Sequence, residues 1–439
     1  MYKTLSSPFV VQVEITENCT NNCVHCYNYW RHATFQKEAL LQLDAFQINK
    51  IMDELERAKV FEVVVTGGEP LLNKSGLFQI LDRVESSDFM FSAINSNLLN
   101  LNIFDAQRLA GYQRLGRILT SLMGPSEEIH DTISGSHGSF NQTIKGIELL
   151  KSCGVAISVN MVVSKLNKEY VQATAQLCKE LRVKTFNATR ATTPLNCPDF
   201  SPYALSLNEL REYLRALSEA GKQFELPVGA LNVYPMCAVK HLRETSMTVG
   251  KRCSAGVTVA VVSSRGDVRA CTHLQESVGN LLIENLPTLW NKMRSWRDGS
   301  LIPSICRECK ALAVCGGGCR AEAQACYGEL NARDPLINEE DIESAVSEYW
   351  LYQSERRHPI KFPSSVVVNP EIRWRSEAFG SACFLENRCV GLFNNDTTRL
   401  LFTDLFGKAH HIVELEKSVP KSFLAELMWK RVLIEAERR

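Results

Sequence analysis

The stretch E-N-C-T-N-N-C-V-H-C-Y at residues 17–27 carries three closely spaced cysteines, Cys19, Cys23 and Cys26. A four-iron cluster takes four thiolate ligands, so a group of three leaves one iron without a protein ligand. An open coordination position is typical of a catalytic rather than a structural metal site. A zinc site that uses His25 as its fourth ligand is the alternative explanation of the same residues.

A second motif, T-G-G-E-P at residues 66–70, follows an apolar run at residues 61–65. Two glycines let a backbone approach a ligand closely, and a carboxylate with exposed carbonyl groups can hold an ammonium group. Together the two motifs resemble those of the radical S-adenosylmethionine (SAM) superfamily, in which C-x3-C-x2-C follows a first strand. The resemblance implies that the open iron chelates the amino acid end of SAM and reduces it to a 5′-deoxyadenosyl radical. It also implies that the Gly-Gly-Glu motif grips the methionine amine.

Strand-like and helix-like segments alternate through the first half of the chain. Apolar residues at helical spacing predict helices such as 140–153, and Asp44 and the pair Ser206 and Glu209 are typical of helix N-termini. Six apolar, β-branched runs lie between the helices, at residues 9–15, 61–65, 91–94, 117–122, 156–163 and 184–188. This alternation predicts an α/β fold with a parallel sheet, in which the C-terminal ends of the strands carry the function. The resemblance implies a partial (β/α)6, TIM-like radical SAM barrel over residues 1–225.

The expected SAM contacts fall at the predicted strand ends. By resemblance they are Gly67, Gly68, Glu69, Pro70, Asn95, Asn97, Ser121, Asn160 and Arg190. For each of the last five residues, the alternative to a SAM contact is a polar loop residue whose hydrogen bonds are made within the protein. Three positions depart from the family pattern: His25 stands where an aromatic residue is common, Leu122 follows the fourth-strand serine in place of an acid, and Ser134 stands where an arginine is frequent. The departures leave open which residue clamps the SAM carboxylate.

A second cysteine array lies between residues 253 and 326. It reads C-x12-G-x4-C, then C-x2-C-x5-C-x3-C, then one more cysteine, and this spacing resembles the SPASM domain of many peptide-modifying radical SAM enzymes. The resemblance implies two auxiliary [4Fe–4S] clusters, one on Cys253, Cys271 and Cys319 and the other on Cys306, Cys309, Cys315 and Cys326. Cys237 is then the natural fourth ligand of the first auxiliary cluster, and an open iron that binds substrate is the alternative. A pair of zinc sites is also compatible with the spacing alone.

The remainder of the chain changes pattern twice. After the expected SPASM region of residues 226–336, residues 337–365 predict a charged helix and a linker with Pro359 and Pro363. Residues 366–439 show β-like and then helical stretches, and they resemble the PqqD-like leader-binding domain of peptide maturases, a small winged-helix module. The resemblance implies that an edge strand captures a precursor's leader peptide by β-addition. A helical cap or a dimer contact is the alternative.

Composition sets the expectations about compartment and partners. The formal net charge is +0 at pH 7, which gives no reason to expect a nucleic acid or an anionic membrane as partner. The most apolar stretch, residues 256–262, is too short to span a bilayer, and the N-terminus lacks the pattern of a signal peptide. Sixteen cysteines without an export signal favour metal ligation in a reducing cytoplasm over disulfides.

These resemblances imply an oxidoreductase that matures a ribosomally made peptide, with three [4Fe–4S] clusters, SAM and an electron donor such as flavodoxin or ferredoxin. A carbon–carbon or thioether cross-link would follow hydrogen abstraction from the peptide. An anaerobic sulfatase maturase is disfavoured, because Thr272 stands where that family pairs an aspartate with the cysteine that stands at Cys271. Epimerisation would need a hydrogen donor, for which Cys197 is the candidate. A zinc-stabilised peptide-binding scaffold without activity is the alternative from outside the enzymes.

Overall fold

The computed structural model describes residues 3–28, 41–195, 197, 199–239, 245–249, 251–355, 361–385 and 388–436. The chain forms two compact units, which we call unit 1 (Ser7–Tyr352) and unit 2 (Lys3–Ser6 with Gln353–Arg439). The finer divisions expected after residues 225 and 336 stay predictions, and Pro359 of the expected linker lies outside the described residues. Among the described residues, no helix is both long and apolar enough to cross a membrane.

Unit 1 is built around one nine-stranded sheet with the order β7-β6-β5-β4-β3-β2-β1-β8-β9. Its strands are β1 (Val10–Glu14), β2 (Glu62–Thr66), β3 (Phe91–Asn95), β4 (Leu115–Ser121), β5 (Ile157–Val163), β6 (Thr185–Arg190), β7 (Val228–Gly229), β8 (Val259–Val262) and β9 (Val268–Arg269). Among the strand pairings of this sheet within the described residues, only that of β8 with β9 is antiparallel. The six predicted strands and the parallel sheet are therefore confirmed.

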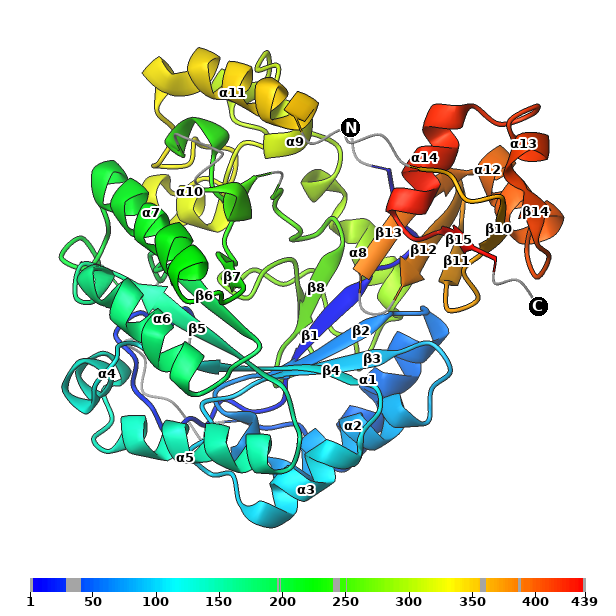
Figure 1. Cartoon of the computed structure of the whole chain (residues 1–439). Coiled ribbons are helices and arrows are strands. Elements are labelled where there is room, and N and C mark those ends of the chain that lie inside the picture. Colours follow the sequence, from blue (N-terminus) through cyan, green and yellow to red (C-terminus); the bar gives the residue numbers. More distant parts are fainter. Residues whose placement is uncertain are drawn as a thin grey trace. The chain divides into compact units, whose positions relative to one another are not determined.

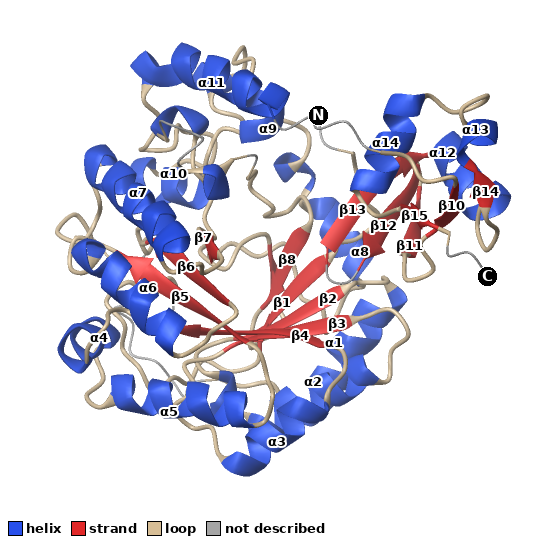
Figure 2. Ribbon diagram, in the orientation of Figure 1, coloured by secondary structure: helices blue, strands red, loops and turns tan. Residues whose placement is uncertain are grey.

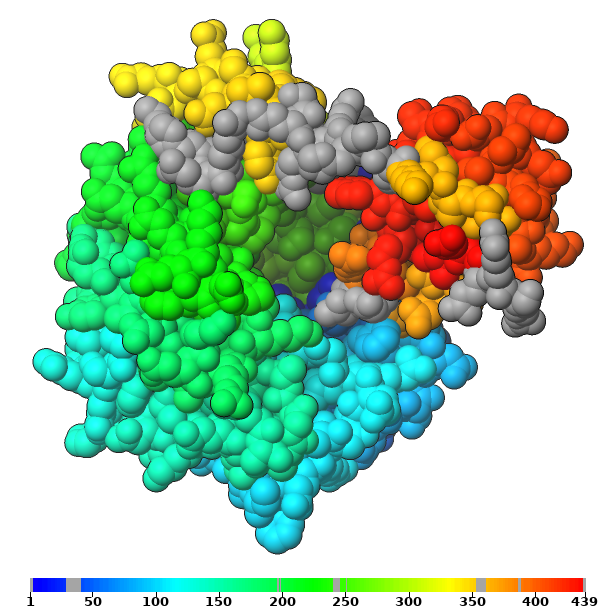
Figure 3. Space-filling view, in the orientation of Figure 1, coloured from blue at the N-terminus to red at the C-terminus, as the bar shows by residue number. Residues whose placement is uncertain are grey.

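Helices connect the strands and cover the outer side of the curved sheet (Figure 1). They are α1 (Ala45–Arg57), α2 (Lys74–Glu85), α3 (Ile103–Gly111), α4 (Glu127–Ser134), α5 (Ser139–Ser152), α6 (Val171–Glu180) and α7 (Leu207–Gln223). The capping box predicted at Ser206 is present with Glu209, and Asp44 forms another with Gln47. The segments that carry α3 to α7 form a continuous outer surface of unit 1 in Figure 3.

The pairing of β8 with β1 was not predicted. Residues 256–262 were noted only as an apolar stretch, yet β8 extends the sheet beside β1 in parallel register, with Val10 opposite Val259. Between β8 and α11 the chain consists of short elements and loops, as Figure 2 shows, with the helices α8 (Leu286–Lys292), α9 (Leu312–Cys315) and α10 (Arg320–Tyr327). The longer helix α11 (Ile342–Glu355) follows.

Unit 2 has its own hydrophobic core and two three-stranded sheets, ordered β14-β10-β15 and β11-β12-β13. Its elements are β10 (Ser365–Val368), β11 (Arg373–Glu377), β12 (Gly380–Leu385), β13 (Arg388–Asn394), α12 (Asn395–Arg399), β14 (His410–His411), α13 (Ile412–Leu415), α14 (Lys421–Trp429) and β15 (Leu433–Glu435). The β-like stretches predicted at 366–368, 381–385 and 390–393 correspond to β10, β12 and β13. The edge strands β11, β14 and β15 were not predicted.

Candidate active site

The candidate site residues lie where the parallel strands of unit 1 end. The cysteine loop (residues 19–26) follows β1, and the T-G-G-E-P turn begins in the last residue of β2. Asn95 ends β3, Ser121 ends β4 and Arg190 ends β6, while Asn160 lies within β5 and pairs with Ser121. Because the carboxyl ends of parallel strands meet at one edge of a sheet, the fold brings both motifs and the expected SAM contacts to the same edge.

The T-G-G-E-P turn is hydrogen-bonded directly to the backbone that leads into the cysteine loop. Gly68 N–H donates to Thr16 O at 2.7 Å, and Glu69 N–H donates to Asn18 O at 2.6 Å. A Cβ atom on Gly68 would lie 2.0 Å from Asn18 O, and one on Gly67, whose φ is +140°, would lie 2.5 Å from Thr16 O. Both glycines are therefore required by the close approach of the two backbones.

The other side of the cysteine loop is held by the turn after α4. Asn22 N–H donates to Ser134 O at 2.8 Å, and Val24 N–H donates to Ile133 O at 3.0 Å. A Cβ atom on Gly135 would lie 2.5 Å from Asn22 O, so the turn approaches the loop as closely as T-G-G-E-P does. Ser134, where the resemblance expects an arginine, thus supports the loop through its carbonyl group.

The Glu69 carboxylate is buried and fully hydrogen-bonded by its neighbours. Oε1 accepts from Ser96 Oγ at 2.7 Å and from Leu71 N–H at 2.9 Å, and Oε2 accepts from Asn97 N–H at 2.7 Å. Burial raises the pKa of Glu69, and these three donors oppose the rise. The carboxylate thereby ties the end of β2 to the end of β3.

Two buried amide oxygens near the T-G-G-E-P turn have no hydrogen-bond partner in the part of the chain that the structure describes. They are Oδ1 of Asn28, whose Nδ2 donates to Gly67 O at 3.1 Å, and Oδ1 of Asn95. Asn97, by contrast, uses its Nδ2 to donate to Thr20 Oγ1 at 2.9 Å. Buried polar atoms are rarely left unsatisfied, so these positions fit a polar ligand with N–H groups, such as the amino acid end of SAM.

Asn160 and Arg190 make contacts with other residues of unit 1. Asn160 Oδ1 accepts from Thr189 Oγ1 at 2.6 Å. Arg190 Nη1 lies 3.3 Å from Glu322 Oε1, and the two side chains are 5% and 3% exposed. Within the described residues, Nε and Nη2 of Arg190 are buried without a hydrogen-bond partner, so the guanidinium retains donors for an anionic group.

His25 lies between the second and third cysteines and is buried near His130. Burial, followed by the charge of His130, lowers the pKa of His25 to about 4, and burial lowers that of His130 to about 4 as well. His130 Nδ1 accepts from Met123 N–H at 3.2 Å. Both rings are therefore neutral at pH 7, and they fill space beside the cysteine loop without adding charge.

Two contacts that the sequence did not suggest join the cysteine loop to the second array. Glu14, the last residue of β1, forms a buried ion pair with Arg269, which lies two residues before Cys271. Tyr27, which follows Cys26, stacks on His273 with ring centroids 4.5 Å apart. Tyr27, Arg269 and His273 each lie within two residues of a cysteine, whereas Glu14 lies five residues before Cys19, and this proximity is the only signal that the sequence offers.

The structure sorts the cysteines of the second array into two groups. In the first group, burial and then the neighbouring Cys253 thiol raise the pKa of Cys271 to about 12. Burial also raises the pKa of Cys319, and Cys253 and Cys271 add to this rise. The second group lines a single cavity and consists of Cys237, Cys306, Cys309 and Cys315. The resemblance implied a different grouping, with Cys237 in the first group and Cys326 in the second.

Cys197, the candidate hydrogen donor, is half-buried in the loop after β6. The residues on either side of it lie outside the described part of the chain. The structure therefore places the thiol on the strand-end side of unit 1 and gives no contact that assigns it a role.

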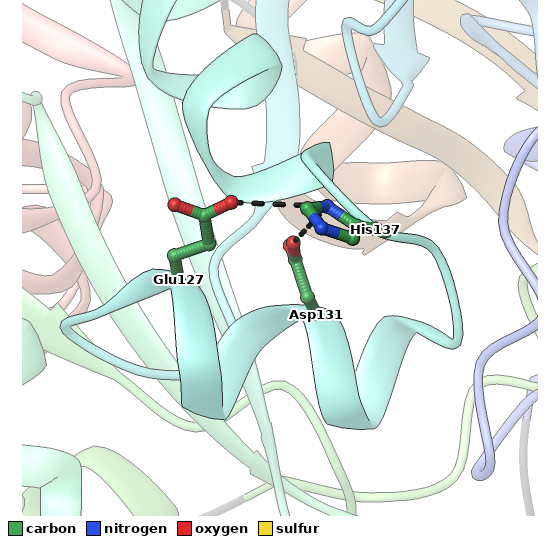
Figure 4. Close-up of side chains that lie close together, drawn as sticks. All are labelled: Glu127, Asp131 and His137. Atoms are coloured by element: carbon green, nitrogen blue, oxygen red, sulfur yellow. Dashed lines mark ion pairs between the residues drawn. The ribbon is translucent and has the colours of Figure 1, made fainter.

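Glu127, Asp131 and His137 form a small cluster beside α4 (Figure 4). Asp131 accepts hydrogen bonds from Gly138 N–H at 2.5 Å, Ser139 Oγ at 2.8 Å and Phe140 N–H at 2.9 Å. The carboxylate therefore caps the start of α5, and the cluster has a structural explanation.

Comparison with known proteins identifies a domain within unit 1. Residues 13–178 match the model of the Radical SAM superfamily. The chain carries a radical SAM domain. The protein is an enzyme, and the expected α/β radical SAM fold is confirmed.

The proteins that this chain is similar to have several different activities in their names. An AdoMet-dependent heme synthase of Methanosarcina barkeri is 28% identical over 76% of this chain and 97% of its own length. The mycofactocin maturase MftC of Mycolicibacterium smegmatis is 26% identical over 75% of this chain and 83% of its own length. Streptococcus suis SuiB bound to its precursor peptide SuiA aligns with a TM-score of 0.59 at 17% identity, over 75% of each chain, and so shares the fold.

Proposed function

We propose that this radical SAM enzyme modifies a ribosomally synthesised precursor peptide, in the cytoplasm, by abstracting hydrogen from an unactivated carbon. A mycofactocin maturase and a protein crystallised with its precursor peptide are among the proteins it resembles. The product that we favour is a carbon–carbon or thioether cross-link, with sulfatase-maturase-like oxidation and epimerisation as the alternatives.

The first cluster and SAM would be held at the edge where the strands end. Cys19, Cys23 and Cys26 would ligate the cluster. The SAM contacts would be Gly67, Gly68, Glu69, Pro70, Asn97, Ser121, Asn160 and Arg190. The unpartnered oxygens of Asn28 and Asn95 support this assignment, and Gly67 and Gly68 hold the turn against the backbone that leads into the cysteine loop. A [4Fe–4S] cluster and SAM bound there supply radical chemistry, and the polypeptide orients them.

Two further [4Fe–4S] clusters in the second array would accept the electron left over when a bond forms, and a donor such as flavodoxin or ferredoxin would reduce the first cluster. The Tyr27–His273 stack and the Glu14–Arg269 ion pair support a fixed arrangement of the two arrays. The carboxylate that a sulfatase maturase needs is replaced by Thr272, a buried residue that cannot act as a base at neutral pH.

The observation that carries the peptide assignment is the edge strand of unit 2. β11 is an end strand of the sheet β11-β12-β13, and a peptide that joins a sheet by β-addition does so beside an end strand. Trp374 on this strand is 44% exposed and stacks on Phe402 with centroids 4.8 Å apart, and Phe406 beside it is also exposed. Exposed aromatic side chains on an end strand suit an extended leader peptide.

A tetrapyrrole substrate is the second candidate, because the heme synthase is 28% identical. That relative matches over 97% of its own length while covering 76% of this chain. The part of this chain outside the match is comparable in length to unit 2. A reaction on a tetrapyrrole gives no evident role to such a unit.

Anaerobic mass spectrometry tests the proposal. The reconstituted enzyme is incubated with SAM, reductant and the short peptide encoded beside its gene, with Cys23→Ala as the control. Loss of two hydrogens from the peptide, matched by 5′-deoxyadenosine, is the expected result. Deoxyadenosine with an unmodified peptide, together with consumption of an added iron tetrapyrrole, would favour the second candidate.

A further inference from the structure

The cavity lined by Cys237, Cys306, Cys309 and Cys315 contains four thiols from two distant segments. Cys306, Cys309 and Cys315 lie on a compact turn that ends with α9, whereas Cys237 lies in the short 3₁₀ turn Met236–Ala238. The rest of the cavity wall is apolar, with Ile337 among its residues. Four thiols around an apolar cavity are the ligand set that a [4Fe–4S] cluster requires.

The position of Cys237 in this cavity is set by backbone contacts. Met236 N–H donates to Cys315 Sγ at 3.4 Å, which joins the two segments directly. Arg211 of α7 donates to Ala238 O at 2.9 Å and forms an ion pair with Asp341 at 2.7 Å. The 3₁₀ turn is thus anchored from two sides, and Cys237 is half-buried at its centre.

Cys326 lies elsewhere. It is on α10, seven residues after Cys319, so about two helical turns separate these cysteines. On a helix, residues four apart share a face, and Cys326 Sγ accordingly lies 3.9 Å from Glu322 Oε2. Both line a second cavity of about 300 Å³ together with Arg190 and Thr193, and the Cys326 residue is exposed.

We propose that Cys237 completes the cluster held by Cys306, Cys309 and Cys315, and that Cys326 is not a cluster ligand. This inference rests on the proposal that the second array holds iron–sulfur clusters. Cys253, Cys271 and Cys319 then bind the other auxiliary cluster with three thiols. One of its iron positions is left to a ligand other than the cysteines of the second array.

Alkylation mapping of the reconstituted wild-type enzyme tests the assignment without any substitution. Iodoacetamide is added anaerobically before and after iron is removed with a chelator, and each cysteine peptide is quantified by mass spectrometry. We expect Cys237 and Cys306 to react only after iron is removed, and Cys326 to react while iron is still bound. Protection of Cys326 by iron, or reaction of Cys237 in the loaded enzyme, would overturn the proposal.

Iron content gives an independent measurement in a variant that lacks the first cluster, Cys19→Ala/Cys23→Ala/Cys26→Ala. Two auxiliary clusters correspond to about eight iron atoms per chain. Adding Cys237→Ala should lower this to about four, or convert one cluster to a three-iron form with its own electron paramagnetic resonance signal. Adding Cys326→Ala should leave both readouts unchanged, as should the control Cys153→Ala.

The two proposals fail differently. If Cys326→Ala rather than Cys237→Ala removes iron, only the ligand assignment is wrong. If the first-cluster variant binds no iron at all, the auxiliary clusters of the proposed function are wrong, and the ligand assignment falls with them. Peptide modification is not a readout in either experiment.

Discussion

Replacement of Gly68 by alanine tests how closely the T-G-G-E-P turn must approach the cysteine loop. The new Cβ would lie 2.0 Å from Asn18 O, whereas real contacts stay beyond 3.0 Å, so one backbone must move by about 1 Å. That movement strains the hydrogen bonds from Gly68 N–H to Thr16 O and from Glu69 N–H to Asn18 O. Overpacking costs about 1–3 kcal/mol and each weakened hydrogen bond about 1 kcal/mol, so we expect a loss of about 3 kcal/mol.

The same movement displaces the groups expected to bind SAM. A shift of about 1 Å at a binding site is large compared with the tolerance of a preorganised contact, and we expect SAM affinity to fall at least about tenfold. Urea unfolding measures the stability, and anaerobic equilibrium binding to the reconstituted enzyme measures the affinity.

Gly111→Ala is the matched control, because no heavy atom lies within 4 Å of a Cβ at this last residue of α3. Alanine there should leave SAM binding unchanged and alter stability by at most about 1 kcal/mol, in the favourable direction. Wild-type affinity and stability in Gly68→Ala would refute the reasoning from the close backbone approach.

Three further predictions concern single side chains. Glu322→Gln leaves the buried Arg190 guanidinium without its counter-charge and should destabilise the enzyme by about 3–5 kcal/mol, whereas Arg190→Met/Glu322→Met should recover most of the loss in urea unfolding. The pKa of His130 is lowered from 6.5 to about 4 in the folded enzyme, so between these pH values the ring is neutral when folded and protonated when unfolded. Its contribution of about 3 kcal/mol to the free energy of unfolding is therefore fully present above pH 6.5 and is lost as the pH falls toward 4. His130→Gln should flatten the loss of stability in that window, and His137→Gln, at a 95% exposed side chain, should not. Trp374→Ala should weaken binding of the precursor peptide at least about tenfold by fluorescence anisotropy, whereas Trp429→Ala, at the end of α14, should leave it unchanged.

The elements that the sequence predicted are those with a strong local signal. The strands β1 to β6 are apolar and β-branched, and the helices between them have clear caps at Asp44 and Ser206. The strand β8 was missed because its apolar residues stand in a cysteine-rich segment and its partner β1 lies 249 residues earlier, with Val10 opposite Val259. Local periodicity carries no information about such a pairing.

The sequence predicted the motifs of the candidate site but not the contacts that join them. The motifs are contiguous, so Gly67 and Gly68 were identified from the resemblance of T-G-G-E-P to the family's Gly-Gly-Glu motif. The Glu14–Arg269 ion pair joins residues 255 positions apart, and neither residue belongs to a motif. The role of Glu69 also depends on distant partners, because Ser96 and Asn97 come from the end of the next strand.

The pairing of β8 with β1 explains how the two cysteine arrays are held relative to each other. The cysteine loop follows β1, β8 runs parallel beside β1, and β9 pairs antiparallel with β8 and ends two residues before Cys271. The consecutive residues Ala260, Val261 and Val262 are buried, so β8 packs against the core on both of its faces. The backbone hydrogen bonds of β1, β8 and β9 therefore join the strands from which the two cysteine arrays continue. Substitutions at Tyr27 or His273 should change the environment between the arrays while leaving their separation unchanged.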